Sequence, residues 1–238
     1  MGVSNEVFVP LTVGTSLFCT CLASLVSAWF QYRRGAVQPG LALAVGLASW
    51  AAVLATTRFI TTASWYDRDA FQMAFSLVLV LVGVVMLRGR GGAAQGPSAE
   101  AAAGRRHQLR WTLAIGTPAG LMAAAVGVGG GLLMVPAYHH VLGLSLRRAV
   151  GTSSASVMII SLFGVATCTA AGWGNASVPP TALGYVDVGP ALFLALPAAA
   201  SARLGVWTAH TINTRALRYG FAVIALLVAV RLFLEALA

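Results

Sequence analysis

The chain has 238 residues, of which 58% are hydrophobic and only 9% are charged, and its mean hydropathy is +0.84. This balance is too apolar for a soluble globular domain of the same length, so it predicts an integral membrane protein. All 15 basic residues are arginines, against six acidic residues. Most of the arginines fall between the apolar runs, which is typical of cytoplasmic loops and argues against a nucleic-acid-binding protein.

The first half of the chain contains three apolar runs, 8–30, 41–57 and 70–87. Each is close to the roughly 20 residues that a helix needs to cross the hydrocarbon core, so we expect three transmembrane helices. Cys19, Cys21 and Cys168 lie inside apolar runs. Their spacing fits neither a zinc site nor a disulfide framework, and we expect them to be packing residues.

A polar segment, 88-RGRGGAAQGPSAEAAAGRRHQLR-110, follows and predicts a cytoplasmic linker without regular structure. After it come an apolar region at 111–143 and three ordinary runs at 154–171, 189–208 and 217–234. The region 111–143 would measure about 50 Å as one helix, well beyond a bilayer core about 30 Å thick. We therefore expect it to tilt, break or turn back.

The two halves echo each other. The stretch 13-VGTSLFCTCLASLVSAWF-30 aligns with 150-VGTSSASVMIISLFGVAT-167, and each Val-Gly-Thr-Ser is predicted to open a long apolar helix. We divide the chain into a first repeat (1–87), the linker (88–110) and a second repeat (111–238). The second repeat has one apolar region more, so we expect the first to be N-terminally incomplete, through residues missing upstream of Met1 or through loss from the gene.

The arginines test whether 111–143 crosses the membrane or returns to the same face. A single crossing leaves eight arginines on the cytoplasmic side and seven outside, whereas a return leaves twelve against three. Only the second arrangement obeys the positive-inside rule. It also makes the two Gly-Thr-Ser helices run in opposite directions, which predicts an inverted repeat of the kind common in secondary transporters.

The glycine cluster at Gly127, Gly129, Gly130 and Gly131 is where we expect the helix to break, with Pro136 reinforcing the break. Unpaired amides from Gly129 to Leu132, at the positive end of a half-helix dipole, would form an anion site. Close helix packing is an alternative explanation of the same glycines.

The paired hydroxyls of the two repeats are the second candidate feature. They belong to Thr15, Ser16, Thr152 and Ser153, after Gly14 and Gly151. They favour a shared substrate site, although helix capping or a bond to the preceding turn is an alternative for each of them.

Several other chemistries are argued against. Leu132 occupies the last glycine position of a dinucleotide fingerprint, and a phosphate-binding P-loop needs a lysine. The adjacent His139 and His140 would point about 100° apart on a helix, so we assign them no metal. Arg203 lies within an apolar run and is expected to snorkel or to pair with a negative group. We expect no catalytic residues, no metal and no cofactor.

The stretch 116-GTPAGLMAAAVGVGGGLLMVPAYHHVLGLSLRRAVGTSSASVMIISLFGVATCTAAG-172 resembles the second repeat of the sulfite exporter TauE/SafE family, also called the toluenesulfonate uptake permease family. The resemblance rests on the triple glycine, the proline five residues on, the basic loop and Ala-Val-Gly-Thr-Ser. It implies transport of small sulfur-containing anions, with substrate contacts at Gly129, Gly130, Gly131 and Leu132 and at the Gly14–Ser16 and Gly151–Ser153 triplets. This sequence departs from the family pattern at its start, where the first glycine-rich segment has no counterpart.

Together these observations predict an all-α integral membrane protein with six full transmembrane helices and one broken or re-entrant glycine-rich segment, arranged as two related halves. We expect a secondary transporter, an exporter of sulfite, thiosulfate or organosulfonates, in a bacterial cytoplasmic membrane. The alternatives are a non-transporting subunit of a larger complex and an N-terminally truncated gene model of such a transporter. The expected partners are a small anion and the lipid bilayer, without nucleic acid, and a homodimer is left open.

Overall fold

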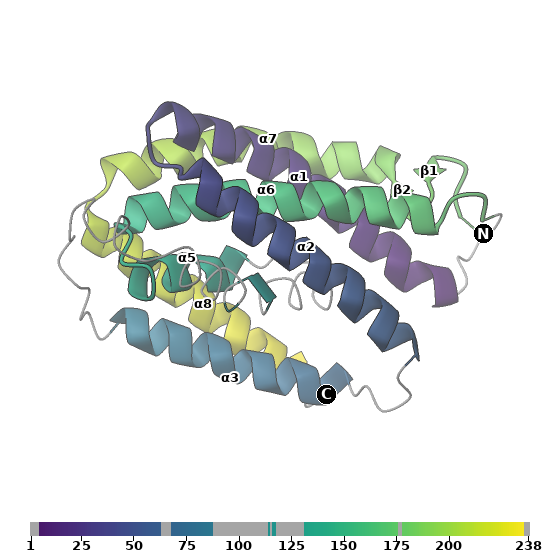
Figure 1. Ribbon diagram of the computed structural model, residues 1–238, viewed down its shortest axis with the longest axis horizontal. Helices are drawn as coiled ribbons and strands as arrows, with labels where there is room; N and C mark the ends of the chain where they lie inside the picture. Colours follow the sequence, from purple (N-terminus) through teal and green to yellow (C-terminus); the bar gives the residue numbers. More distant parts are fainter. Residues whose placement is uncertain are drawn as a thin grey trace.

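The computed structural model describes residues 5–62, 68–87, 114, 116–117, 131–175 and 178–235. In chain order its elements are α1 (Asn5–Arg33), α2 (Pro39–Thr62), α3 (Arg68–Leu87), α5 (Gly131–His140), α6 (Leu146–Ala171), β1 (Ala182–Leu183), β2 (Val186–Asp187), α7 (Val188–Thr211) and α8 (Thr214–Glu235) (Figure 1). Helices dominate, so the expectation of a largely helical chain is confirmed. Six complete crossings and an inverted repeat stay predictions.

Helices α1 and α6 form the centre of the fold (Figure 1). Helix α7 packs on α1, α2 and α5 pack on α6, and α3 pairs with α8. The two central helices are antiparallel, because Leu17 contacts Gly164 whereas Ser27, further along α1, bonds to Ser154. The first helices of the two halves therefore lie against each other in opposite directions.

Helix ends follow the local sequence. Helix α1 stops at Gly35, which takes a left-handed conformation (φ 66°), and the Ala36 N–H returns to the Gln31 carbonyl at 3.0 Å. Pro39 then supplies the first residue of α2, where its missing N–H is harmless. This tight connection fixes where α2 begins relative to α6.

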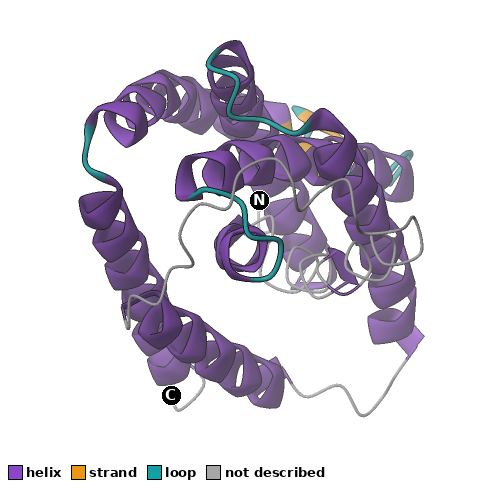
Figure 2. Cartoon of the chain, turned by 60° about the vertical axis from the view of Figure 1, so that its left-hand side comes forward, coloured by secondary structure: helices purple, strands orange, loops and turns teal. Residues whose placement is uncertain are grey.

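The connection between α6 and α7 is longer and contains a β-hairpin, the strands drawn in orange in Figure 2. Its two strands are antiparallel, with Ala182 opposite Asp187 and Leu183 opposite Val186. Gly184 turns the hairpin (φ 61°), close to the backbone of Thr169. This hairpin departs from the all-α expectation. The sequence did not predict it, because strands of two residues are too short to leave a periodic pattern.

Many small residues lie in the interior beside the large ones of the apolar cluster, and many other large apolar residues face outward. The fully covered positions include Ala42, Ser49, Ala191, Ala195, Ala222, Ala225 and Ala229. By contrast, Phe193 is 82% exposed and Leu196 is 68% exposed. Small residues at helix interfaces with bulky apolar residues outside are typical of membrane bundles, where lipid covers the outer surface.

All six ordinary runs form helices, but most extend beyond the expected bounds. The largest difference is at α6, which begins at Leu146, whereas the apolar run begins at 154. Its first turn carries Arg147 and Arg148, so an apolar window misses it. By length and composition, three stretches of the described helices are able to cross a membrane: Pro10–Arg33, Leu146–Ala171 and Val188–Thr211.

Candidate functional site

The described part of α5 starts at Gly131, the last glycine of the cluster, and residues 118–130 before it lie outside the described residues. Its ten residues cover about 15 Å. The first turn of any helix has N–H groups without partners inside the helix, and it carries the positive end of the dipole. The anion site expected at the amides of Gly129 to Leu132 stays a prediction, because Gly129 and Gly130 lie outside the described residues.

Ser153 of α6 lies beside this helix start. A methyl group on Gly131 would lie 3.9 Å from the Ser153 Oγ and 3.2 Å from Cγ2 of Val157. Ser153 is only 5% exposed. The structure therefore brings together two of the predicted site residues, Gly131 and Ser153.

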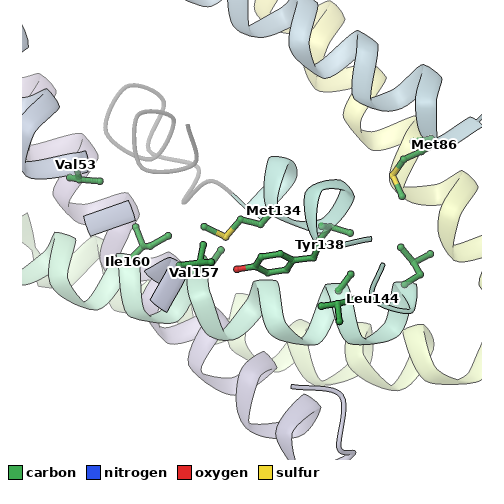
Figure 3. Packing of buried hydrophobic residues seen from close by; sticks show 12 residues of the cluster. Val53, Met86, Met134, Tyr138, Leu144, Val157 and Ile160 are labelled. Atoms are coloured by element: carbon green, nitrogen blue, oxygen red, sulfur yellow. The ribbon is translucent and has the colours of Figure 1, made fainter. Parts of the chain in front are cut away.

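Tyr138 holds α5 against α6. Its hydroxyl points from α5 toward α6 (Figure 3) and lies 2.8 Å from the Ser156 Oγ. Because Ser156 donates its own proton to the Thr152 carbonyl at 3.1 Å, Tyr138 is the donor of the pair. Met134 and Val157 pack beside this ring within the same apolar cluster. Tyr138 therefore fixes the register in which the start of α5 meets Ser153.

The Gly-Thr-Ser triplets lie inside their helices, which corrects the expectation that they open them. Helix α1 begins at Asn5 and α6 at Leu146, ahead of Gly14 and Gly151 respectively. The Thr15 hydroxyl donates to the Leu11 carbonyl at 2.7 Å, which is the bond to the preceding turn that was the alternative for this residue. Its only proton is thus engaged within the helix.

Both threonines accept a hydrogen bond from the backbone of the other half. The Gln38 N–H donates to Thr152 Oγ1 at 3.1 Å, and the Asp187 N–H donates to Thr15 Oγ1 at 3.0 Å. Gln38 immediately precedes α2, and Asp187 immediately precedes α7. Each threonine therefore anchors the start of a helix that lies across the central pair.

The neighbouring glycines make room for the same connections. A side chain on Gly151 would collide with the Ala36 carbonyl, and one on Gly14 would collide with the Tyr185 carbonyl. Ala36 and Tyr185 each lie two residues before the N–H that binds the threonine. Gly-Thr in each half is thus one unit, in which glycine admits the incoming backbone and threonine accepts its N–H.

The other predicted site residues are placed as follows. Gly127, Gly129 and Gly130 lie outside the described residues. Ser16 is exposed on α1. Pro136, which was expected to reinforce the break, lies inside α5, and this helix continues past it to His140.

Sequence reasoning missed the two backbone N–H groups and Tyr138. Gln38-Pro39 and Asp187 do show helix-start chemistry, but nothing in the sequence states which side chain receives their N–H groups. Tyr138 is one aromatic among several and gives no separate signal.

Arginines gather at one end of the bundle. Arg34 donates to the Val206 carbonyl at 3.5 Å and Arg147 to the Ile212 carbonyl at 3.3 Å, so both satisfy carbonyls at the end of α7. Arg203 lies 5.3 Å from the centre of the Phe30 ring, a cation–π contact in place of a negative partner. Asp187 lies at the opposite end of α7, about 36 Å along the helix axis from Thr211.

Metal chemistry has no support from the described side chains, where no group of three or more His, Cys, Asp or Glu residues could hold an ion. The three cysteines are free thiols, each partly buried. The Cys19 thiol donates to the Ala191 carbonyl at 3.3 Å, as a packing residue would.

Two known proteins are similar to this chain in sequence. A probable membrane transporter protein of Haemophilus influenzae is 28% identical over 116 residues, covering 49% of this chain and 44% of that protein. The chain thus matches less than half the length of this relative. A probable membrane transporter protein of Methanocaldococcus jannaschii is 22% identical over 88% of this chain and 74% of its own. No solved structure matches the chain.

The family pattern described as sulfite exporter TauE/SafE matches residues 7–232, nearly the whole chain. Both relatives are thus named as probable membrane transporters. The match includes both Gly-Thr units, the start of α5 and the helices that they anchor. The chain belongs to the sulfite exporter TauE/SafE family.

Proposed function

We propose that the chain is a secondary transporter that exports small sulfur-containing anions such as sulfite, thiosulfate or organosulfonates. The observation that carries the proposal is the approach of Gly131, the last residue of the glycine cluster, to the largely buried Ser153 of α6. An oxyanion of this size can accept hydrogen bonds from several N–H and O–H groups at once. The substrate class and the outward direction follow the family resemblance.

In this proposal the anion binds the amides of Gly129 to Leu132 and the Ser153 hydroxyl. The Gly-Thr units have a different role, because Thr15 and Thr152 already hold the starts of α7 and α2. They position the helices around the site, and Ser153 alone of the second triplet contacts the substrate. Neutral donors and a helix dipole suit a transporter, since they bind an anion without the permanent charge that would trap it.

We further propose that the two halves form an inverted repeat. Each position of the first repeat corresponds to the position 137 residues later in the second repeat. Gly14-Thr15 corresponds to Gly151-Thr152, Leu17 to Ser154, and Ser27 to Gly164. Leu17 contacts Gly164, and Ser27 bonds to Ser154 at 3.1 Å. The positions that correspond to Leu17 and Ser27 in the first repeat are thus the ones that Ser27 and Leu17, respectively, contact in the second. A two-fold axis between α1 and α6 would require this exchange.

The end that carries Arg34 and Arg147 is the cytoplasmic end in this proposal. Arg34 lies at the end of α1, and Arg147 at the start of α6. Both bond to the end of α7, so they share one face of the bundle. That grouping supports the return of 111–143 to its starting face, because a single crossing would separate these arginines.

The test is anion flux into or out of liposomes that contain the purified chain. We expect saturable flux of sulfite, thiosulfate or a small sulfonate, and a loss of at least 10-fold in Ser153→Ala. Ser154→Ala is the matched control, because Ser154 is adjacent but bonds to Ser27 and to the Val150 carbonyl. Wild-type protein without flux for any of these anions, or equal flux in S153A and S154A, would refute the proposal.

A further inference from the structure

A group of polar atoms without described partners lies at the other end of α5, where α5 and α8 share an apolar cluster. The Nε2 atom of His140 and the Nε atom of Arg218 are buried, and neither has a hydrogen-bond partner among the described residues. His140 is the last residue of α5, and Arg218 is in the first turns of α8. These two helices share one apolar cluster, in which Tyr138 and Leu144 pack with Ala222, Leu217 and Phe221.

The surroundings of this pair are positive. The His139 ring lies 4.8 Å from that of His140, and its Nδ1 is 2.8 Å from the Leu144 carbonyl, which orients it. The Arg218 guanidinium lies 5.7 Å from the centre of the Tyr219 ring. The nearest acid with a described side chain, Asp187, precedes α7 at the opposite end of the bundle. No described carboxylate balances the charge.

Two buried polar nitrogens without partners are unfavourable, and the cost is larger when the group is charged. A water molecule could accept from them but would bring no negative charge. One anion would satisfy both nitrogens and balance Arg218, because an oxyanion accepts several N–H groups through different oxygens. The arrangement therefore fits a ligand better than an empty site.

We propose that His140 and Arg218 form an accessory anion site at the cytoplasmic end of α5, about one helix length from Ser153. Its ligand is a tetrahedral or pyramidal oxyanion, either a free anion from the cytoplasm or the phosphate of an anionic lipid. If the proposed transport function holds, a free anion here is the substrate at a waiting position before it reaches the start of α5. The site itself does not depend on transport.

The test is a sulfite titration of the full chain in nanodiscs of zwitterionic phosphatidylcholine, in which isothermal titration calorimetry measures the binding. We expect Arg218→Gln to weaken one binding event at least 10-fold and His140→Gln to weaken the same event. Ser153→Ala should leave that event unchanged. Arg215→Gln is the charge-matched control, because Arg215 is exposed on the same helix. Affinity in R218Q equal to that in R215Q would overturn the proposal.

Nanodiscs that contain phosphatidylglycerol distinguish the two sources of anion. If a lipid phosphate occupies the site, native mass spectrometry shows a retained phosphatidylglycerol that is lost in R218Q, and sulfite binds more weakly than in phosphatidylcholine. If the free anion occupies it, the lipid leaves sulfite affinity unchanged. Either result supports the site. The proposal is opposed if R218Q retains phosphatidylglycerol and binds sulfite as the wild type does.

The wild-type protein offers a measurement that does not depend on how the variants fold. The ¹⁵N signal of His140, assigned by its absence in H140Q, should shift on addition of sulfite or phosphatidylglycerol. No shift with either would overturn the proposal. If liposomes show no anion flux but this signal still shifts, the proposed transport function is refuted and the accessory anion site is supported.

Discussion

Thr152 Oγ1 accepts the backbone N–H of Gln38, which lies 114 residues earlier in the chain, at a distance of 3.1 Å. Thr152 is fully buried, so this N–H has no water to replace the lost acceptor. We expect Thr152→Val to keep the shape of the side chain and to destabilise the fold by about 1–3 kcal/mol. Thermal unfolding in detergent measures the effect. Thr152→Ser should remain near wild type because it retains the oxygen.

The control for this change is Thr208→Val. Thr208 is exposed on α7, and its hydroxyl donates to the Leu204 carbonyl of its own helix at 2.8 Å. Its replacement should leave the unfolding temperature nearly unchanged. Equal losses in T152V and T208V would show that the bond to Gln38 does not hold α2.

Gly151→Ala should be more damaging than an alanine elsewhere in the helices. Its methyl group would collide with the Ala36 carbonyl, which belongs to the tight turn after α1 and cannot move alone. Overpacking of this kind destabilises by about 1–3 kcal/mol. Gly205→Ala is the matched control, because no atom lies within 4 Å of its added methyl group. Alanine there should be neutral or stabilising by up to about 1 kcal/mol. Unfolding temperatures that rank the two the other way would contradict the contact.

The sequence predicted much of the fold because helices that face lipid or other helices are long apolar runs. All six ordinary runs became helices, and the antiparallel relation of α1 and α6 agrees with the distribution of arginines. The Gly-Thr units were identified as important but given the wrong place in their helices. Their partners, Gln38 and Asp187, come from distant backbone, and such pairing cannot be known before the helices are assembled.

A disulfide can test the central pair of helices directly. The Oγ atoms of Ser27 and Ser154 are 3.1 Å apart, so cysteines at both positions should form a bond across α1 and α6. The background would replace Cys19, Cys21 and Cys168 by alanine. With a protease site inserted in 88–110, the cleaved halves should stay together on a gel until reduced.

Ser27→Cys combined with Ser161→Cys is the control for that cross-link. Ser161 lies about 10 Å further along α6, beyond the reach of a disulfide. Halves that separate in S27C/S154C, or that stay linked equally in the control, would contradict the antiparallel register.

Tyr138→Phe should disturb the position of α5 against α6 while changing the stability of the fold only slightly. It removes the hydroxyl that donates to Ser156 and fixes α5 against α6, but it keeps the ring in its apolar cluster. We expect a stability loss of about 1 kcal/mol and a rise in the KM for anion flux, because the start of α5 is no longer held at Ser153. Tyr32→Phe, at an exposed position, should change neither quantity. A variant with wild-type KM would show that this bond does not position the site.

Acid should destabilise the junction of α5 and α8. Burial, and then the charges of His139 and Arg218, lower the pKa of His140 below its usual 6.5, so the folded chain favours neutral imidazole. The contribution of this group to stability is therefore complete above about pH 6.5 and is lost as the pH falls through the folded-state pKa. In anion-free buffer, the unfolding temperature of the wild type should drop more between pH 7.5 and 5 than that of His140→Gln. Sulfate should reduce this difference, because an anion at Arg218 stabilises the charged imidazole. Identical pH profiles for wild type and H140Q would show that His140 does not couple to folding.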